Sequence, residues 1–334
     1  MSLLLTIKPG SDGWTPTRWR ERFVGALPDH TIVLDGVDRY DPAQVRYAAV
    51  WKPDAGFLAR LPNLEVIFNL GAGVDAVLAD ASLPPHVPLV RVVNADLTGR
   101  MTEYVTLHVL LHHRRFLELR RAQADTVWLG KYQWAARAVR VGIMGLGTLG
   151  RDAAEVLLRL GFKVSGWSRT AKSVPGVKVY AGNEQLLEFL RTTDILVALV
   201  PLTTETRGIL DTRLFKQLAR DGVFEAPVVI NAGRGGLQVE ADILACLADG
   251  TLGAASLDVF QTEPLPATSP LWDHPDIIIT PHNAADSDAD AIAADVAAQI
   301  LALEKAGNSV TSSSVPAAIE AQHTGDKTWP APTP

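Results

Sequence analysis

The chain has 334 residues and a formal net charge of −6, and its 47% apolar and 20% charged content suits two folded domains and argues against wholesale disorder. The acidic balance argues against a nucleic-acid-binding surface, and with no signal peptide and no run of ~20 apolar residues we expect a cytoplasmic protein without a membrane partner. The single cysteine, Cys246, cannot form an internal disulfide, and no Cys/His cluster has zinc-ligand spacing, so no metal site is predicted.

Short apolar strands alternate with helices over residues 1 to about 100, where a helix follows each of the first two strands. Alternation of this kind predicts a parallel sheet with covering helices. The predicted strands are Leu3–Ile7, Ala48–Trp51, Leu64–Asn69 and Leu89–Val93.

A long helix is predicted from Glu103 to about Arg121, where good helix formers run without Gly or Pro. The segment Trp128–Trp134 then predicts an exposed aromatic arm. Such side chains can form an interface or can fold against their own domain, and the sequence leaves both possibilities open.

From Val139 onward the alternation becomes regular, and six strands are predicted, the number found in a doubly wound dinucleotide-binding sheet. Apolar residues at helical spacing predict a last helix over Asp288–Lys305. The tail after Ser309 is rich in Ser, Thr, Pro and Ala, and we expect it to be poorly ordered. The six strands are Val139–Met144, Lys163–Trp167, Asp194–Val200, Val228–Asn231, Ala254–Val259 and Ile277–Thr280.

The first of these strands runs directly into a glycine-rich turn, and a helix follows it. A GxGxxG pattern is weak alone, but the strand before it, the helix after it and a second strand about twenty residues on indicate a dinucleotide-binding turn. Gly145 permits the tight turn, Gly147 lets the backbone approach the pyrophosphate, and Gly150 allows close packing of helix on strand. The free N–H groups at the helix N-terminus favour phosphate. The predicted cofactor-binding turn is Gly145, Leu146, Gly147, Thr148, Leu149 and Gly150.

The end of the second strand indicates which dinucleotide binds. NAD sites carry an Asp or Glu there for the ribose 2′-OH, whereas this chain has Ser168, Arg169 and Thr170, with Lys172 just beyond. The guanidinium of an arginine can bind a 2′-phosphate through paired hydrogen bonds, whereas a carboxylate would repel that phosphate. NADP is therefore predicted in preference to NAD, and Arg169 is a stronger candidate than Lys172.

Three polar side chains follow successive strands further on: Arg234 in a glycine-rich turn, Glu263 in the next loop, and His282 after the last strand. Ligands of open α/β sheets bind at the carboxyl ends of strands, so we expect the three side chains to meet at one edge. There Arg234 can neutralise the carboxylate of a 2-oxo acid and polarise its carbonyl. His282 can donate a proton as hydride arrives at carbon, and Glu263 can fix the imidazole tautomer.

Nearly the whole chain, from about residue 45 to 310, resembles the D-2-hydroxyacid dehydrogenase family, and most closely its glyoxylate/hydroxypyruvate reductase A branch. The resemblance rests on four segments: 166–169 (Gly-Trp-Ser-Arg), 198–206 (Ala-Leu-Val-Pro-Leu-Thr-Thr-Glu-Thr), 257–266 (Leu-Asp-Val-Phe-Gln-Thr-Glu-Pro-Leu-Pro) and 269–275 (Ser-Pro-Leu-Trp-Asp-His-Pro). It implies NADPH-dependent reduction of glyoxylate or hydroxypyruvate, with Arg234 binding substrate, Glu263 assisting and His282 as the acid/base.

The resemblance also implies two doubly wound parallel-sheet domains and a homodimer formed through residues around 103 to 135. The flavodoxin-like substrate domain is expected from residues 1–100 and 287–310, the Rossmann domain from 101–286, and the tail from 311–334. Further cofactor contacts are implied for Val200, Pro201, Thr206, Ala232 and Asp258, and substrate contacts for Trp51, Gly71, Ala72, Gly73, Val74 and Trp272. For the two tryptophans, core packing is an equal alternative.

Two other functions stay open. A dinucleotide-sensing binding protein has the same fold, although the Arg–Glu–His set and the lack of a partner-binding extension favour an enzyme. A dehydrogenase for a bulkier 2-oxo acid such as phenylpyruvate is the other alternative, because pocket volume depends on several loops.

Overall fold

The computed structural model describes residues 2–8, 15–71, 73–286 and 288–305. Two compact units are found within them. One unit contains the described residues up to Leu97 together with helix α9 (Ala289–Lys305), and the other contains Thr98–Asp286. The predicted tail, residues 311–334, lies outside the described residues.

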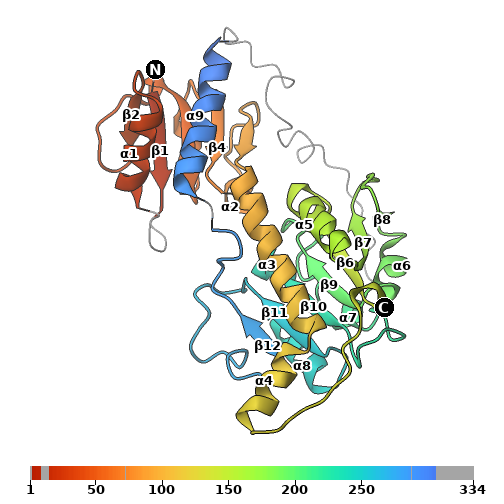
Figure 1. Cartoon of the computed structure of the whole chain (residues 1–334). Coiled ribbons are helices and arrows are strands. Elements are labelled where there is room, and N and C mark those ends of the chain that lie inside the picture. Colours follow the sequence, from red (N-terminus) through yellow and green to blue (C-terminus); the bar gives the residue numbers. More distant parts are fainter. Residues whose placement is uncertain (1, 9–14, 72, 287, 306–334) are drawn as a thin grey trace. The chain divides into compact units, whose positions relative to one another are not determined.

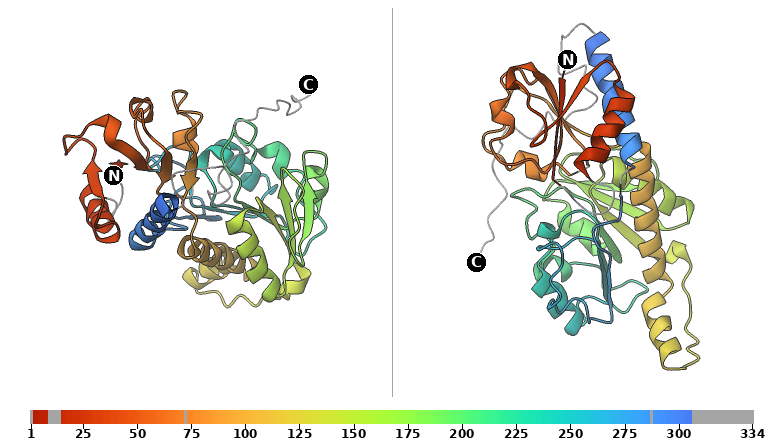
Figure 2. Two further views of the ribbon diagram at one scale, coloured as in Figure 1. Left: turned by 90° about the horizontal axis from the view of Figure 1, so that it is seen from above. Right: turned by 90° about the vertical axis from the view of Figure 1, so that its left-hand side faces the viewer.

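The first unit is built on a five-stranded parallel sheet in the order β2-β1-β3-β4-β5, which is the flavodoxin-like order. Helices α1 (Pro16–Ala26) and α9 lie side by side on one face, as Figures 1 and 2 show, and pack apolar side chains such as Trp19 and Val296 against the strands. The short elements α2 (Asp75–Leu78) and η2 (Leu58–Arg60) contribute to the cover of the other face. The strands are β1 (Ser2–Ile7), β2 (Thr31–Leu34), β3 (Val45–Trp51), β4 (Val66–Asn69) and β5 (Leu89–Arg91).

The second unit is built on a seven-stranded parallel sheet in the order β12-β11-β10-β9-β6-β7-β8. This is the Rossmann order with one strand added beyond β11. Helices α3 (Ala95–His113) and α5 (Thr148–Arg159) cover one face, and α6 (Leu186–Arg191), α7 (Thr212–Phe215) and α8 (Glu240–Ala248) cover the other (Figure 1). The strands are β6 (Arg140–Met144), β7 (Lys163–Ser168), β8 (Lys178–Ala181), β9 (Ile195–Ala198), β10 (Val228–Asn231), β11 (Ala254–Leu257) and β12 (Ile277–Ile279).

The prediction of two parallel-sheet α/β domains is confirmed, but the predicted number of strands is wrong in each. Strands β2 and β8 are missing from the prediction, and both are four-residue strands at a sheet edge. In β8 only Tyr180 is buried, so the strand lacks the apolar run that marks a central strand. The helix predicted after Trp51 is also wrong, because only η2 follows β3 before the next strand.

The long helix predicted from Glu103 to Arg121 is two helices. Helix α3 begins at Ala95, where the Asn94 side chain accepts a hydrogen bond from the Leu97 N–H at 2.9 Å and caps the helix. A break at Arg115, whose φ is +56°, separates α3 from α4 (Phe116–Ala124).

The predicted aromatic arm is exposed: the exposed fractions of Trp128 and Tyr132 are 99% and 72%. Within the described residues, no helix combines the length and apolarity that crossing a membrane requires.

Candidate active site

The glycine-rich turn follows β6, where the strand order of the large sheet reverses. Gly145 has a φ of +115°, which side chains rarely allow, and a Cβ on Gly150 would overlap the Gly145 carbonyl oxygen. A Cβ on Gly147, in contrast, would meet no atom within 4 Å. Gly147 is also the N-cap of α5, without a capping side chain, so open space adjoins the first N–H groups of that helix. Of the other turn residues, Leu146 is buried, Leu149 is half-buried and Thr148 is exposed.

The remaining predicted cofactor residues follow neighbouring strands. Val200 lies just after β9, and a Cβ on Gly145 would strike its backbone nitrogen, so the two loops touch. Thr206 closes the loop after β9 by donating its hydroxyl to the Pro201 carbonyl at 2.7 Å. Ala232 follows β10 and is buried. These residues therefore stand at one edge of the sheet with the glycine-rich turn.

The basic segment after β7 lies against the same turn. The buried Ser168 donates its hydroxyl to the Thr170 carbonyl at 2.7 Å, while Arg169 and Thr170 are exposed. The Lys172 ammonium donates to the Leu146 carbonyl at 2.9 Å. The structure thus brings Lys172 onto the glycine-rich turn and leaves the Arg169 side chain open to solvent.

Arg234 is carried by a turn that the buried Asn231 holds. The Asn231 amide donates to the Arg234 carbonyl at 3.0 Å and to Gln238 Oε1 at 2.8 Å, and its oxygen accepts the Gly233 N–H at 3.0 Å. Gln238 in turn donates to the Val259 carbonyl at 2.9 Å, which ties the turn to the end of β11. The Arg234 guanidinium donates to the Gly233 carbonyl at 2.7 Å.

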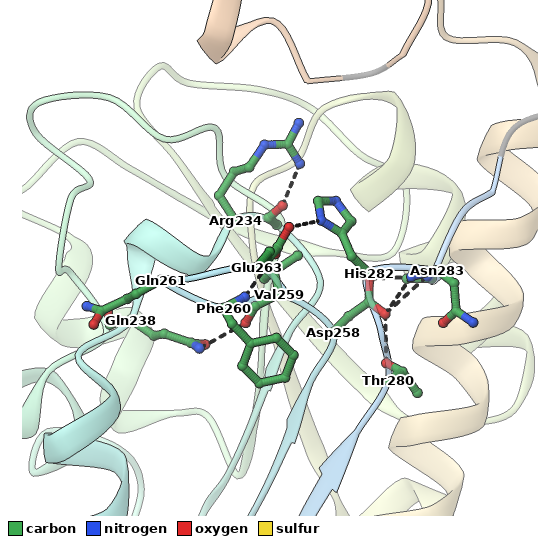
Figure 3. Close-up of polar contacts among 12 residues, drawn as sticks. Arg234, Gln238, Asp258, Val259, Phe260, Gln261, Glu263, Thr280, His282 and Asn283 are labelled. Carbon is green, nitrogen blue, oxygen red and sulfur yellow. Dashed lines mark hydrogen bonds and ion pairs between the residues drawn. The ribbon is translucent and has the colours of Figure 1, made fainter. Parts of the chain in front are cut away.

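Glu263 and His282 form a pair at this edge. Oxygen Oε2 of Glu263 lies 2.7 Å from Nδ1 of His282, and oxygen Oε1 accepts the Phe260 N–H at 3.0 Å. The carboxylate can therefore hold Nδ1 protonated and orient the ring, which leaves Nε2 for chemistry. The His282 side chain is 42% exposed, so a substrate can reach it. Figure 3 shows Arg234 and His282 extending to the same side of the loops that carry them.

The buried Asp258 holds the turn that carries His282, whose φ is +54°. Its Oδ1 accepts the Thr280 hydroxyl at 2.7 Å and the Asn283 N–H at 3.0 Å, and its Oδ2 accepts the Ala284 N–H at 3.1 Å (Figure 3). Burial raises the pKa of Asp258, and these hydrogen bonds oppose that rise. The carboxylate is thus engaged with the backbone of the turn, and its implied contact with cofactor stays a prediction.

The predicted substrate residues near the N-terminus belong to the first unit. A Cβ on Gly71 would overlap the indole of the half-buried Trp51, so only glycine fits beneath that ring. Gly73 is half-buried and Val74 is buried before α2. Ala72 lies outside the described residues.

Trp272 belongs to the second unit and is 49% exposed, so it is not a core residue. Its indole N–H donates to the Pro266 carbonyl of its own loop at 3.0 Å. No group of His, Cys, Asp or Glu side chains that could hold a metal ion occurs among the described residues.

Two buried asparagines escaped the sequence prediction. Asn69 and Asn231 are the last residues of β4 and β10, and each binds the glycine turn that follows. Asn69 donates to the carbonyls of Gly71 and Gly73 at 2.6 and 3.0 Å. The signal was present, because both turns read Asn-x-Gly-x-Gly directly after a buried strand.

Comparisons with known proteins agree with this geometry. Residues 106–284 match the family model described as "D-isomer specific 2-hydroxyacid dehydrogenase, NAD binding domain". The chain is 42% identical over 269 residues to the glyoxylate/hydroxypyruvate reductase A of Serratia proteamaculans, covering 79% of this chain and 84% of that one. It is 40% identical over 271 residues to the reductase of the same name from Yersinia enterocolitica, covering 80% of this chain and 85% of that one.

Solved structures extend the similarity. An NADPH-dependent glyoxylate/hydroxypyruvate reductase from Sinorhizobium meliloti, solved with NADP and sulfate, is 44% identical with a TM-score of 0.84, covering 91% of this chain and 95% of that one. A probable 2-hydroxyacid dehydrogenase from Rhizobium etli, solved with NADP, HEPES and tartaric acid, is 43% identical with a TM-score of 0.85 and the same coverage of both chains. The chain belongs to the D-2-hydroxyacid dehydrogenase family of NAD(P)-dependent enzymes, in its glyoxylate/hydroxypyruvate reductase A branch.

Proposed function

We propose that this protein uses NADPH to reduce small 2-oxo acids, glyoxylate and hydroxypyruvate, to the corresponding 2-hydroxy acids. The observation that carries the proposal is the 2.7 Å contact between Glu263 and His282, at the sheet edge where Arg234 and the glycine-rich turn also lie. The names of the relatives at about 40% identity support the choice of substrates.

The residues around the glycine-rich turn fit a phosphorylated dinucleotide. The open space beside Gly147 adjoins the uncapped N-terminus of α5, which favours a pyrophosphate. The exposed Arg169 suits the 2′-phosphate of NADP, and the described turn from Ser168 to Lys172 has no carboxylate to receive a ribose 2′-OH. NADP-bound relatives with TM-scores of 0.84 and 0.85 support the same choice. When bound, NADPH supplies the hydride that reduces the carbonyl carbon.

His282 provides the proton that the reaction requires. The Glu263 carboxylate accepts a hydrogen bond from Nδ1 and orients the ring, so that Nε2 can donate its proton to the carbonyl oxygen. Each turnover therefore consumes a hydride and a proton and yields the 2-hydroxy acid. The His282 proton is restored from solvent, which its exposed ring can reach.

Arg234 binds the anionic substrate in this proposal. Its guanidinium can hold a carboxylate through two parallel hydrogen bonds and polarise the neighbouring carbonyl. The hydrogen bonds of the Asn231 side chain fix the backbone at Gly233 and Arg234. We keep Trp51, Trp272 and the N–H groups of residues 71–74 as proposed substrate contacts.

We propose further that residues 1–100 and 287–310 form the substrate domain and residues 101–286 the dinucleotide domain, in a cytoplasmic homodimer. The exposed Trp128 and Tyr132 support a dimer interface around the aromatic arm. Size-exclusion chromatography with light scattering tests the dimer, with a Trp128→Ser variant expected to weaken it.

A substrate panel tests the function. We expect NADPH absorbance to fall when glyoxylate or hydroxypyruvate is added, more slowly with NADH, and more slowly still with phenylpyruvate. An Arg169→Ala variant should lower the preference for NADPH over NADH by about tenfold, the value of a charge-assisted hydrogen bond. A flat trace with every 2-oxo acid, despite NADPH binding, would instead indicate a dinucleotide sensor, and fastest turnover of phenylpyruvate would move the substrate class to bulkier acids.

A further inference from the structure

A buried polar chain runs from helix α3 to the turn that carries His282. The Tyr104 hydroxyl on α3 lies 2.9 Å from the Thr280 hydroxyl, which donates to Asp258 at 2.7 Å. Asp258 accepts the backbone N–H groups of Asn283 and Ala284, and its own carbonyl accepts the His282 N–H at 2.7 Å. Helix α3 is thus joined through two side chains to the residues on both sides of the acid/base.

The direction of these hydrogen bonds is fixed by chemistry. A carboxylate only accepts, so the single proton of the Thr280 hydroxyl points to Asp258, and the Tyr104 hydroxyl must donate to Thr280. Burial raises the pKa of Tyr104, so its hydroxyl keeps its proton at any working pH. Successive donors polarise one another and favour the ionised form of the carboxylate at the end of the chain.

The Tyr104 ring is itself held in place. The His108 ring stacks on it with a centroid distance of 4.0 Å and an interplanar angle of 30°. Nδ1 of His108 and Nε2 of His112 each lie 2.8 Å from the hydroxyl of the fully buried Ser256 on β11. One hydroxyl can donate to one ring and accept from the other, which requires that the accepting ring be neutral. Burial lowers their pKa values to about 4 and about 3, so both are neutral near pH 7.

We infer that Tyr104 is a positioning residue for His282: through Thr280 it fixes the Asp258 carboxylate, which holds the backbone of the His282 turn. The inference rests on the proposed function, because positioning matters only if His282 transfers a proton. Tyr104, on helix α3, would then support the reaction in addition to Arg234, Glu263 and His282.

The consequence is a dependence on pH. Two titratable groups interact electrostatically with Asp258: His282 on the same turn and, across Thr280, Tyr104 on α3. The neutral His108 and His112 lie beyond Tyr104. Protonation of Asp258 removes the charge that holds the backbone of the turn, so we expect the reductase rate to fall on acidification as the turn loosens. Removing the Tyr104 hydroxyl weakens the donors to Asp258 and should raise the pH at which that loss occurs.

The test compares Tyr104→Phe with Tyr180→Phe, whose hydroxyl lies 3.4 Å from the hydroxyl of Thr192 in the same unit and outside the proposed site. For Tyr104→Phe we expect kcat to fall by about three- to tenfold, with KM for NADPH unchanged. The acidic limb of the pH profile of kcat should shift to higher pH by about half to one unit. Tyr180→Phe should keep the wild-type profile. Thr280→Val should lower kcat and shift the acidic limb at least as much as Tyr104→Phe, whereas Thr280→Ser, which keeps the hydroxyl, should behave like the wild-type protein. Adding Tyr104→Phe to Thr280→Val should cause no further change.

Amide hydrogen exchange at Asn283 and Ala284 tests the inference without activity, and we expect it to be about three- to tenfold faster in Tyr104→Phe than in Tyr180→Phe. Equal exchange and equal pH profiles in these two variants would overturn the inference, and so would a lower melting temperature of Tyr104→Phe with an unmoved acidic limb. If the wild-type protein reduces no 2-oxo acid, the proposed function fails, and the exchange rates alone decide whether Tyr104 holds the turn.

Discussion

Two turns at the same edge of the large sheet are held in different ways. The glycine-rich turn from Gly145 to Gly150 depends on the absence of side chains: Gly150 leaves room for the Gly145 carbonyl oxygen, and Gly147 leaves open space. The His282 turn depends on a side chain from a distant part of the sequence, since Asp258 accepts the backbone N–H groups of Asn283 and Ala284. The conformation of a turn that binds a ligand through its own N–H groups can be determined by its local sequence. A turn that orients an acid/base side chain needs contacts with several other elements.

The largest expected effect separates the two turns. His282→Ala removes the proton donor and should lower kcat by about 10²- to 10⁴-fold, the usual contribution of general acid catalysis. NADPH binding should stay at the wild-type level, because the glycine-rich turn is untouched. The measurement is kcat at saturating glyoxylate beside an NADPH titration by fluorescence, and equal loss of binding and turnover would contradict a separation of roles.

A smaller loss is expected from Arg234→Lys. Lysine keeps the charge but cannot make the paired hydrogen bonds of a guanidinium, so kcat/KM for glyoxylate should fall by about 10- to 100-fold. Steady-state kinetics measure the change, and Arg213→Lys is the matched control, because the exposed Arg213 bonds only the neighbouring Asp211 among the contacts the structure describes. An unchanged KM for glyoxylate in Arg234→Lys would contradict the proposed role of Arg234 in substrate binding.

Two glycine variants test the other turn. Gly150→Ala forces a Cβ onto the Gly145 carbonyl oxygen and should cost about 1–3 kcal/mol of folding stability. Gly147→Ala places its Cβ in open space, so the melting temperature should stay at the wild-type value while the Kd for NADPH rises about tenfold. Thermal unfolding and NADPH titration on both variants provide the check; similar behaviour of the two would mean that the glycines share one role.

A last prediction concerns pH and the two buried histidines next to Tyr104, with an effect of similar size. The folded pKa values of His108 and His112, about 4 and about 3, lie below the unfolded value of about 6.5, so the unfolded chain binds more protons in acid. Stability should therefore be full above pH 6.5 and fall as the pH drops toward 4, by about 1–2 kcal/mol per histidine between pH 7 and pH 5. Urea unfolding at the two pH values measures the loss; His112→Gln should reduce it, and a substitution of the exposed His86 should not.

The same contrast explains what sequence could predict. The glycine-rich turn was readable because the strand, the glycines and the helix are adjacent in sequence. Arg234, Glu263 and His282 were readable because each follows a strand, and parallel strands end at one edge. Strand β8 was missed because it buries only Tyr180, and β2 was missed because its apolar run is only three residues long.

The supporting residues were missed for a different reason. Tyr104 contacts Thr280 across 176 positions of sequence, and His108 contacts Ser256 across 148, so no local pattern records either contact. Asn69 and Asn231 were the exceptions, since the repeated Asn-x-Gly-x-Gly pattern was visible in the sequence.

The measurement that tests the central claim most directly is the balance between NADPH consumed and product formed with hydroxypyruvate as substrate. The account predicts one D-glycerate for each NADPH oxidised in the wild-type protein, and no D-glycerate above background in His282→Ala at equal NADPH occupancy. NADPH that binds but is not consumed by any 2-oxo acid, or His282→Ala that forms D-glycerate at the wild-type rate, would contradict it.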